Sequence, residues 1–518
     1  MNLTGLNFLG EKRSGNGNQA FRAVNPANNE ELEPRYIEAT KQEINQAIEL
    51  AEEAFQVYRH KSGAEKGKFL ETIADEIMYL GDELIERCIA ETGLTRKRLE
   101  GERARTVNQL KLFGEVLVEG SWVDARINTE ESSPTIKSMK MALGPVGVFG
   151  ASNFPMAFSV AGGDTASALA AGCTIVVKAH PAHPGTCELV AGAVGKAIEK
   201  TGMPKGTFSM VQGASKDVGM AIVNHPYIKS IGFTGSFNGG KALFDAAVNR
   251  PEPIPVHAEM GSTNPVFLLP GALKENKDNI AEGVTNSVNL GVGQFCTKPG
   301  LVVYEDSEDA QNFRATLTEQ FQKAQPGTML TPDISTAYRK GLDNLLQQEG
   351  VQLIANSEEN GTNSGNAHLL QVGSDHFLSN QELEKEVFGP VILAVTAENS
   401  KKLVRIAENL QGHLTASLFG TEEDLENYKD LIAVLQRKVG RLIFNGYPTG
   451  VAVNHAMIHG GPFPATTDSR TTSVGTSAIN RFARPVCFQN FPDSQLPDEL
   501  KDNNPLNIFR LVNGKWQQ

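Results

Sequence analysis

The sequence predicts an α/β protein with two sheet domains, the first of them built on a doubly wound parallel sheet. Two observations lead to this prediction. From about residue 140 to residue 250, short apolar runs rich in β-branched residues alternate with helical patterns, which is typical of parallel βαβ units. A second alternating block runs to about residue 445, and a chain of 518 residues, 40% of them hydrophobic, is long enough to bury both cores.

The predicted elements follow in order along the chain. Residues 38–90 place apolar side chains three and four positions apart with charges between them, so we expect helices there. The predicted strands of the first sheet are GPVGVFGA, CTIVVKAH, FSMVQG and IKSIGFTG, each followed by a helical pattern. The second block has the candidate strands LVVYE, VQLIAN, VILAVTA and RLIFN, with helices near 310–325, 334–349 and 423–438. Ligands of a doubly wound sheet bind at the C-terminal ends of its strands.

The predicted domain boundaries follow these blocks. Residues 1–120 and 142–260 form the first domain, and residues 261–445 form the second. The stretches 121–141 and 484–518 fit neither block, because the first alternates loosely and the second is rich in Pro and Asn. Each could be part of a β arm that pairs with another subunit, and the alternatives are a surface hairpin and a plain tail. We expect a homodimer or a homotetramer.

Composition and charge exclude several classes of protein. Lys and Arg number 48 against 60 Asp and Glu, and the formal charge of -12 disfavours a nucleic-acid partner. No apolar run approaches the roughly 18 residues of a membrane span, and the N-terminus lacks a basic leader and an A-x-A cleavage site, so we expect a cytoplasmic protein. The five cysteines are scattered and never form C-x-x-C, which indicates neither a disulfide framework nor a zinc ribbon.

The stretch FTGSFNGGKA, residues 233–242, resembles a nucleotide-triphosphate loop, but Ala242 stands where that motif has Ser or Thr. A strand, a glycine-rich turn and a helix place free backbone N–H groups against a phosphate. Triphosphate chemistry also needs a hydroxyl on Mg²⁺, which Ala242 lacks. The stretch therefore predicts a dinucleotide pyrophosphate site, with an ordinary βα loop as the alternative, and Lys241 is expected in the first turn of the helix.

Three residues are candidates for chemistry. Cys296 lies in GVGQFCTKPG with Lys298 two positions on, and nearby positive charge would lower the pKa of a thiol; the alternative is an inert loop cysteine. Glu259, in HAEMGSTNP, is either a salt-bridged structural group or a general base whose pKa is raised by burial. Asn153 follows the first strand of the sheet and is either a turn residue or an oxyanion donor.

Six motifs occur in the order and spacing of the aldehyde dehydrogenase superfamily. They are ASNFP, VVKAHP, FTGS with Gly240, E-x-G-S-x-N-P, GQ-x-C and EVFGP. On these residues the chain resembles that superfamily, and the variants KAHPAHPGT, FNGYPTGV and HGGPFPATTDSRTTSVG resemble its α-ketoglutaric semialdehyde (2,5-dioxovalerate) dehydrogenases, with a fatty-aldehyde branch nearby. The resemblance implies a Rossmann-type cofactor domain, a second α/β catalytic domain and a β oligomerisation arm.

The resemblance also implies a role for each candidate. Cys296 would add to the aldehyde to give a thiohemiacetal, and Asn153 with the Cys296 backbone N–H would hold its oxyanion, a contact worth roughly 3 kcal/mol per donor. Hydride transfer to the nicotinamide would leave a thioester. Glu259 would activate the water that hydrolyses it, so that α-ketoglutaric semialdehyde would be released as 2-oxoglutarate.

The implied cofactor residues share positions at turns and strand ends. They are Lys178 at a ribose hydroxyl, Gly213 and Gly219 near the adenine, Gly235 and Ser236 at the pyrophosphate, Gly240 at the helix start, and Glu386 and Phe388 at the nicotinamide ribose. One departure matters. Pro181 stands where NAD-preferring relatives have an acidic residue, and His180 and His183 are close in sequence, so we expect NADP or NAD with NADP slightly favoured. The alternative for both histidines is a turn residue.

The implied substrate carries a carboxylate, which calls for a cation or several hydroxyl and amide donors. Phe158 and Ser287 are the candidate substrate residues, and Arg470 is the candidate cation, with a structural salt bridge as its alternative. His455 and His459, in HAMIH, resemble half a metal site without the Glu of H-E-x-x-H, so no metal is assigned.

Three other functions stay open. A medium- or long-chain aldehyde dehydrogenase would prefer hexanal to the semialdehyde. A phosphate-loop NTPase would hydrolyse ATP with Mg²⁺ and lose that activity in Lys241→Ala. A noncatalytic member of the fold would keep its function in Cys296→Ala.

Overall fold

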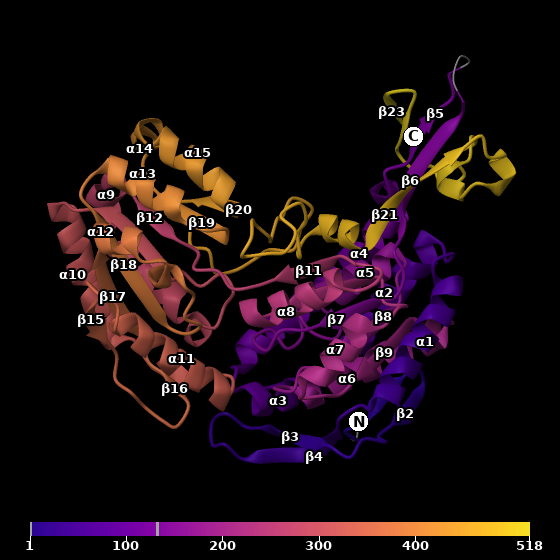
Figure 1. Ribbon diagram of the computed structural model, residues 1–518, viewed down its shortest axis with the longest axis horizontal. Helices are drawn as coiled ribbons and strands as arrows, with labels where there is room; N and C mark the ends of the chain where they lie inside the picture. The colour runs from indigo at the N-terminus through magenta and orange to yellow at the C-terminus, as the bar shows by residue number, and fades with distance from the viewer. Residues whose placement is uncertain (1–2, 131–133) are drawn as a thin grey trace.

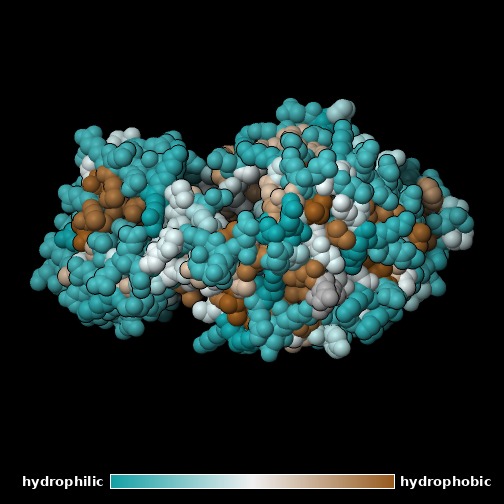
Figure 2. Space-filling view, turned by 90° about the horizontal axis from the view of Figure 1, so that it is seen from below, coloured by the Kyte–Doolittle hydropathy of each residue, from teal (hydrophilic) through white to brown (hydrophobic). Residues whose placement is uncertain are grey.

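The computed structural model describes residues 3–130 and 134–518. These residues form two lobes, each built on a sheet covered by helices, and an arm that projects beside the N-terminal lobe (Figure 1). Residues 445–482, mostly without regular structure, run between the lobes. Seen from below, the surface is mainly hydrophilic and is hollowed where the two lobes meet (Figure 2).

The first lobe contains a seven-stranded sheet in the order β11-β10-β7-β8-β9-β1-β2. Its parallel strands are β7 (Val146–Phe149), β8 (Ile175–Lys178), β9 (Phe208–Val211), β10 (Ser230–Thr234) and β11 (Val256–Glu259). The two antiparallel edge strands are β1 (Asn7–Leu9) and β2 (Lys12–Ser14). Chain order reverses between β7 and β10, so the doubly wound sheet is confirmed and its topological switch point lies between these strands.

Helices bury the first sheet on both faces. The helices of this lobe are α1 (Lys41–Tyr58), α2 (Gly63–Tyr79), α3 (Gly81–Thr92), α4 (Arg96–Glu119), α5 (Gly163–Ala171), α6 (Pro184–Thr201), α7 (Lys216–Asn224) and α8 (Phe237–Val248). Every residue of β7, β9 and β11 is buried, and the first two are the mostly apolar runs VGVF and FSMV that the sequence predicts as strands, whereas β11 reads VHAE and was not predicted. The predicted helical region is confirmed. Its first two helices begin with capping boxes, Thr40 with Glu43 and Ser62 with Glu65.

The second lobe contains another seven-stranded sheet, in the order β15-β17-β18-β13-β12-β19-β20. Its strands are β12 (Val266–Leu268), β13 (Leu301–Glu305), β15 (Gln352–Asn356), β17 (His368–Gly373), β18 (Val391–Ala397), β19 (His413–Phe419) and β20 (Val439–Phe444). Its helices are α9 (Pro270–Asn289), α10 (Glu308–Lys323), α11 (Pro332–Leu346), α12 (Ser374–Ser379), α13 (Ser400–Asn409), α14 (Glu422–Asn427) and α15 (Lys429–Lys438). Only β15 runs antiparallel to its neighbour within this sheet as described.

The arm is a five-stranded sheet in the order β21-β6-β5-β22-β23. Its strands are β5 (Arg126–Asn128), β6 (Ile136–Ala142), β21 (Ala483–Gln489), β22 (Arg510–Val512) and β23 (Lys515–Gln517). The two stretches that fit neither block therefore share one sheet, and the alternative of a plain C-terminal tail is wrong. Residues 131–133 of the predicted arm lie outside the described residues.

Shorter strands complete the fold. They are β3 (Ala20–Val24) paired with β4 (Glu31–Ile37), and β14 (Gly327–Thr328) paired with β16 (Ser364–Gly365). Over the two described ranges, no helix combines the length and the apolar composition that crossing a membrane requires.

Candidate active site

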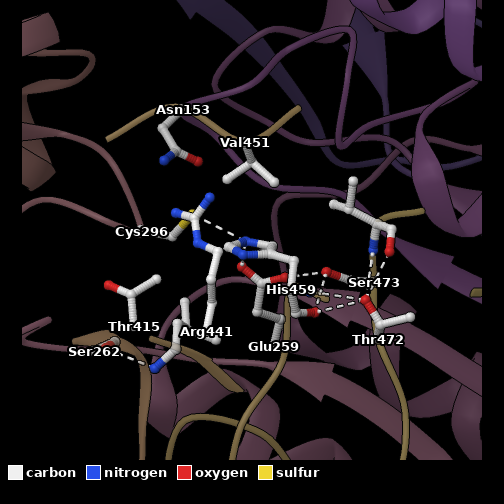
Figure 3. Close-up of polar contacts among 12 residues, drawn as sticks. Asn153, Glu259, Ser262, Cys296, Thr415, Arg441, Val451, His459, Thr472 and Ser473 are labelled. Carbon is white, nitrogen blue, oxygen red and sulfur yellow. Dashed lines mark hydrogen bonds and ion pairs between the residues drawn. The ribbon is translucent and has the colours of Figure 1, made fainter. Parts of the chain in front are cut away.

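Four segments far apart in the sequence meet between the two lobes. Asn153 follows β7, Glu259 ends β11, Cys296 precedes β13, and His459 belongs to the segment that runs between the lobes. One ligating atom each of Glu259, Cys296 and His459 lies within 4.8 Å of the others. Figure 3 shows these three side chains together, with Asn153 on the side of Cys296.

The loop that carries Cys296 is held from behind by Asn264. The Asn264 side-chain amide donates to the carbonyl oxygens of Cys296, at 2.8 Å, and Lys298, at 3.0 Å. Its own oxygen accepts from the hydroxyls of Ser262 and Thr415. Asn264 is completely buried, so each of these bonds satisfies a group that water cannot reach. The asparagine of the E-x-G-S-x-N-P motif therefore fixes the backbone of the thiol.

The environment of Cys296 differs from the predicted one. Burial, followed by the negative charge of Glu259, raises the pKa of the thiol well above its ordinary value, and Arg105 opposes this shift. Lys298, the expected cation, instead points into the second lobe, where its Nζ donates to the carbonyls of Val387 and Val391. In the resting protein the thiol is therefore protonated, and its proton needs an acceptor nearby.

That acceptor is His459, which lies between Cys296 and Glu259. His459 Nε2 lies 3.5 Å from Cys296 Sγ and 2.8 Å from Glu259 Oε1. The Ser473 hydroxyl donates a short hydrogen bond to Glu259 Oε2. Burial would raise the pKa of Glu259, but the charge of His459 and the hydrogen bonds of His459 and Ser473 outweigh it and lower that pKa. Of the two alternatives for Glu259, the raised pKa is therefore wrong, because its partners compensate for burial, and the carboxylate is paired, with His459.

His459 is the residue of this cluster that sequence reasoning missed. The motif HAMIH pointed to it, but as half a metal site. In the structure His455 is exposed whereas His459 is 1% exposed, so the two histidines do not share a site. The backbone N–H of His459 donates to the Thr472 hydroxyl, and this hydroxyl donates to the carbonyl of His459. The two bonds fix the backbone of His459 and hold its ring beside the thiol. A buried histidine between a thiol and a carboxylate can take up the proton of the thiol while the carboxylate stays ionised.

Asn153 lies in a turn that is fixed from α4. Its side-chain amide donates to the carbonyl of Gln294 at 3.0 Å, and its backbone carbonyl accepts from Arg98 at 3.0 Å. Further along the same turn, the backbone N–H groups of Met156 and Ala157 donate to Glu102, at 2.8 and 3.0 Å. An amide NH₂ has two donors, so Asn153 keeps one N–H beyond its bond to Gln294 for an oxyanion.

Of the predicted ribose and adenine residues, Lys178 ends β8, Gly213 follows β9 and Gly219 lies within α7. The Lys178 Nζ donates to the carbonyl of Gly213 at 2.6 Å, and burial lowers the pKa of Lys178 to about 8. A side chain at Gly219 would come within 3.2 Å of the Phe149 ring, and one at Gly213 would strike Val218 at 2.6 Å. A side chain is therefore excluded at Gly213 and tightly limited at Gly219.

The predicted pyrophosphate residues lie at the start of α8, beside the switch point. Ser236 is the N-cap, and its hydroxyl accepts from the backbone N–H of Gly239. Gly235 N–H donates to the carbonyl of Glu259 at 3.0 Å. Helix α8 begins at Phe237, so Gly240 lies inside its first turn. A Cβ added at Gly240 would strike Met260 at 2.7 Å. A capped helix N-terminus at this place suits an anion.

Lys241 has the ordinary role that the sequence suggested. It lies within α8 and its Nζ pairs with Asp245 one turn later. This i,i+4 pair is partly exposed and leaves the lysine on the surface of the helix.

The predicted nicotinamide-ribose residues lie between the lobes. Glu386 is half-buried and packs against Gly261, where an added Cβ would meet its Oε2 at 2.3 Å. Burial raises the pKa of Glu386 to about 7, although the charge of Lys298 opposes the rise. Phe388 is half-buried two residues later. Lys178, the capped N-terminus of α8 and the half-buried carboxylate of Glu386 together provide donors and an acceptor of the kinds that ribose and phosphate groups bind.

The two histidines near Pro181 differ in exposure, because His180 is half-buried and His183 is completely buried. Burial and then the charges of His183 and Lys178 lower the pKa of His180 well below its ordinary value, so this ring is neutral. His183 is completely buried, and its ring contacts the Cys187 thiol at 3.3 Å and the Ala151 carbonyl at 3.1 Å. Although burial lowers it, the charge of Cys187 raises the pKa of His183 to about 9, so this ring is charged but enclosed. Neither histidine therefore presents an exposed positive charge to a 2′-phosphate.

The predicted substrate residues are divided by the structure. The ring of Phe158 lies 6.3 Å from the ring of His459, and Ser287 shares a 2.8 Å hydrogen bond with Thr449 in the segment that follows β20. Arg470 is a different case: its side chain is 86% exposed and pairs with Asp468 at 2.9 Å. The structural salt bridge, given as the alternative for Arg470, is thus the arrangement that the structure contains.

The fold and the site together define the class of protein: an enzyme with a doubly wound nucleotide-binding type of sheet and a thiol beside a carboxylate. A family model described as "Aldehyde dehydrogenase family" matches residues 12–471. The chain therefore belongs to the aldehyde dehydrogenase family, and the predicted family and fold are confirmed. A nicotinamide dinucleotide cofactor is typical of this family, and its substrates are aldehydes.

Relatives with known names are similar over their whole length. The chain is 48% identical over 524 residues to alpha-ketoglutaric semialdehyde dehydrogenase 2 of Azospirillum brasilense, covering 99% of this chain and 100% of the relative. It is 45% identical over 522 residues to alpha-ketoglutaric semialdehyde dehydrogenase of Acinetobacter baylyi, with 99% of each covered. Among solved structures, betaine aldehyde dehydrogenase of Staphylococcus aureus in complex with NAD⁺ is similar in fold, with a TM-score of 0.81 and 20% identity over 95% of this chain and 96% of that one.

Proposed function

We propose that this protein oxidises α-ketoglutaric semialdehyde to 2-oxoglutarate with a nicotinamide dinucleotide. The cluster of Cys296, Glu259 and His459 supports this proposal, because it combines a nucleophile, a proton acceptor and a carboxylate for activating water. The substrate is proposed from the names of two relatives, both alpha-ketoglutaric semialdehyde dehydrogenases. They are 48% and 45% identical to this chain and match 99% of it.

The residues of the chain divide the reaction between them. His459 takes the proton of Cys296, and the thiolate adds to the aldehyde carbon. The remaining N–H of Asn153 and the Cys296 backbone N–H donate to the oxyanion of the thiohemiacetal. After oxidation to the thioester, Glu259 takes a proton from the attacking water, for which its lowered pKa keeps it ionised.

The cofactor supplies the hydride acceptor when it is bound. We propose that Lys178, Ser236 and the turn around Gly235 hold its ribose and pyrophosphate, and that Glu386 and Phe388 hold the nicotinamide ribose. NADP and NAD are both proposed as cofactors, with NADP slightly favoured, because Pro181 provides no carboxylate against a 2′-phosphate. The neutral His180 and the enclosed His183 limit that preference to a modest one.

The assembly and the location remain predictions. We propose a homodimer or a homotetramer that associates through the five-stranded arm, because arm side chains stay exposed although they are large and apolar, among them Phe491, Phe509 and Trp516. A cytoplasmic location and the lack of a nucleic-acid partner are expected from composition.

The proposed function is tested by kcat/KM for α-ketoglutaric semialdehyde and for hexanal, each with NAD and with NADP, from absorbance at 340 nm. We expect the semialdehyde to be preferred. A tenfold or greater preference for hexanal would assign the protein to the fatty-aldehyde branch instead. Cys296→Ala should abolish NAD(P)H formation and retain cofactor binding, and full activity in this variant would contradict the proposed role of the thiol.

A further inference from the structure

A substrate with a carboxylate needs a cation that Arg470 does not provide. Three other guanidinium groups lie close enough to Cys296 for its charge to act on them: Arg98, Arg105 and Arg441. Arg98 and Arg105 are on one face of α4, and Arg441 is on β20. What distinguishes them is how many of their N–H groups are already bound.

Two of these groups serve as backbone anchors. Arg98 donates to the carbonyl of Asn153 at 3.0 Å. Arg441, whose side chain Figure 3 shows extending toward Cys296, donates to the carbonyls of Pro448, at 2.7 Å, and Gly450, at 3.1 Å. Arg441 therefore uses both terminal nitrogens to hold loops beside the site, and Arg98 uses its Nη2, which also lies 3.6 Å from Glu102 Oε2.

Arg105 is different, because both of its terminal nitrogens are buried without a hydrogen-bond partner in the described chain. Only its Nε is engaged, at 3.4 Å from the carbonyl of Val451. A guanidinium group presents its N–H donors in a planar fork that matches the two oxygens of a carboxylate. A buried cation with two free donors side by side is thus an incomplete anion site rather than a finished structural contact.

The position of Arg105 suits the far end of a short substrate. Its Cζ lies 4.9 Å from the ring centroid of Phe158, and the Phe158 ring lies 6.3 Å from the ring of His459, whose Nε2 is 3.5 Å from Cys296 Sγ. Arg105 is therefore one aromatic ring away from the reactive cluster. An extended five-carbon chain spans about 5 Å between its end carbons, so its aldehyde and its carboxylate engage different residues.

We propose that Arg105 is a specificity-determining residue that binds the carboxylate of the aldehyde substrate through Nη1 and Nη2, while Phe158 packs against the carbon chain. The proposal rests on the proposed function, since it requires an aldehyde that carries a carboxylate. Arg105 thus takes the role of substrate-binding cation for which the sequence suggested Arg470.

The test compares two aldehydes in three variants. Arg105→Met removes the fork at similar volume, Arg105→Lys keeps the charge without the fork, and Lys111→Met removes an exposed charge from the same helix as the control. For Arg105→Met we expect kcat/KM for α-ketoglutaric semialdehyde to fall about 100-fold, mainly through KM, and kcat/KM for pentanal to change by less than about threefold. Arg105→Lys should recover part of the loss, and Lys111→Met should match the wild type.

Other outcomes would overturn the proposal in distinguishable ways. Equal losses for both aldehydes would mean that Arg105 acts on the charge of Cys296 rather than on the substrate. No loss for either would mean that Arg105 contacts no substrate. If the wild type does not prefer the semialdehyde to pentanal, the proposed function itself fails, whatever the variants do.

One measurement needs no variant and so does not depend on how Arg105→Met folds. Glutarate should compete with pentanal in the wild-type enzyme, because it presents a carboxylate to Arg105. Pentane-1,5-diol, of the same length and without charge, should compete at least tenfold more weakly. Equal inhibition by the two compounds would contradict a carboxylate site.

Discussion

At the residue scale, the pKa of Cys296 decides how the thiol reacts at different pH. Because burial and Glu259 raise this pKa well above its ordinary value, the thiolate fraction increases about tenfold per pH unit through neutral and mildly alkaline solution. We expect the rate of inactivation by iodoacetamide to increase in the same way without reaching a plateau by pH 9. Loss of activity in a Cys487→Ser background measures it, since Cys487 is exposed. A plateau near pH 7 would instead mean that His459 keeps the thiol ionised.

Glu259 should matter more for hydrolysing the thioester than for forming it. Glu259→Gln keeps the shape and a hydrogen-bond acceptor but cannot take a proton from water, so hydrolysis of the thioester should slow about 100-fold or more. Rapid mixing should then show a burst of one NAD(P)H per site followed by a slow steady state. Ser473→Ala, which removes only the hydroxyl bonded to Glu259, is the milder comparison. A variant that loses the burst as well would assign Glu259 to thiol activation.

The pH dependence of hydrolysis is linked to His459. A carboxylate with a lowered pKa stays active as pH falls until that lowered value is reached, which for Glu259 lies below its ordinary 4.5. Removing the charge and the donor of His459 should raise this pKa. We expect the acid limb of kcat to move to higher pH in His459→Gln, measured from about pH 4 to pH 8 under conditions where hydrolysis limits the rate. An unchanged acid limb would show that another group controls it.

At the element scale, helix α4 positions the turn that carries Asn153. Glu102→Leu leaves the N–H groups of Met156 and Ala157 without their buried acceptor, at about 1–3 kcal/mol each. We expect a lower midpoint of thermal unfolding and a kcat/KM reduced at least tenfold, because the oxyanion donor is displaced. Glu102→Gln, which retains one acceptor oxygen, should be milder on both measures. If Glu102→Leu changes stability alone, the turn does not depend on α4.

The sequence predicted most elements but not every contact between them. Strands β7 to β10 are largely apolar runs, which a sequence shows directly, whereas β11 reads VHAE and was not predicted. Strand β2 reads KRS and exists only because β1 pairs with it and with β9, a tertiary effect that no local pattern reveals. His459 reaches Cys296 across 163 residues of sequence. Arg470 and Arg105 are the same residue type, and only the fold distinguishes the exposed one from the one with unpaired buried donors.

At the scale of the whole molecule, the arm is the part expected to control assembly. Phe509→Asp with Trp516→Asp places two charges on its exposed apolar face, so the mass measured by light scattering after gel filtration should decrease toward that of one chain. Tyr79→Asp, on an exposed position of α2 that is 80% accessible, is the control and should leave the mass unchanged. If the double variant keeps the wild-type mass, association uses another surface.

The convergence of four distant segments at one point has a consequence for how the protein loses its activity. Asn153 and Glu259 come from one lobe, Cys296 from the other, and His459 from the chain that runs between them. Catalysis is therefore a property of the docked lobes and belongs to neither alone. In mild denaturant, turnover should disappear while both sheets still give a native circular dichroism spectrum, so that enzymatic rate reports on lobe separation before any strand has melted.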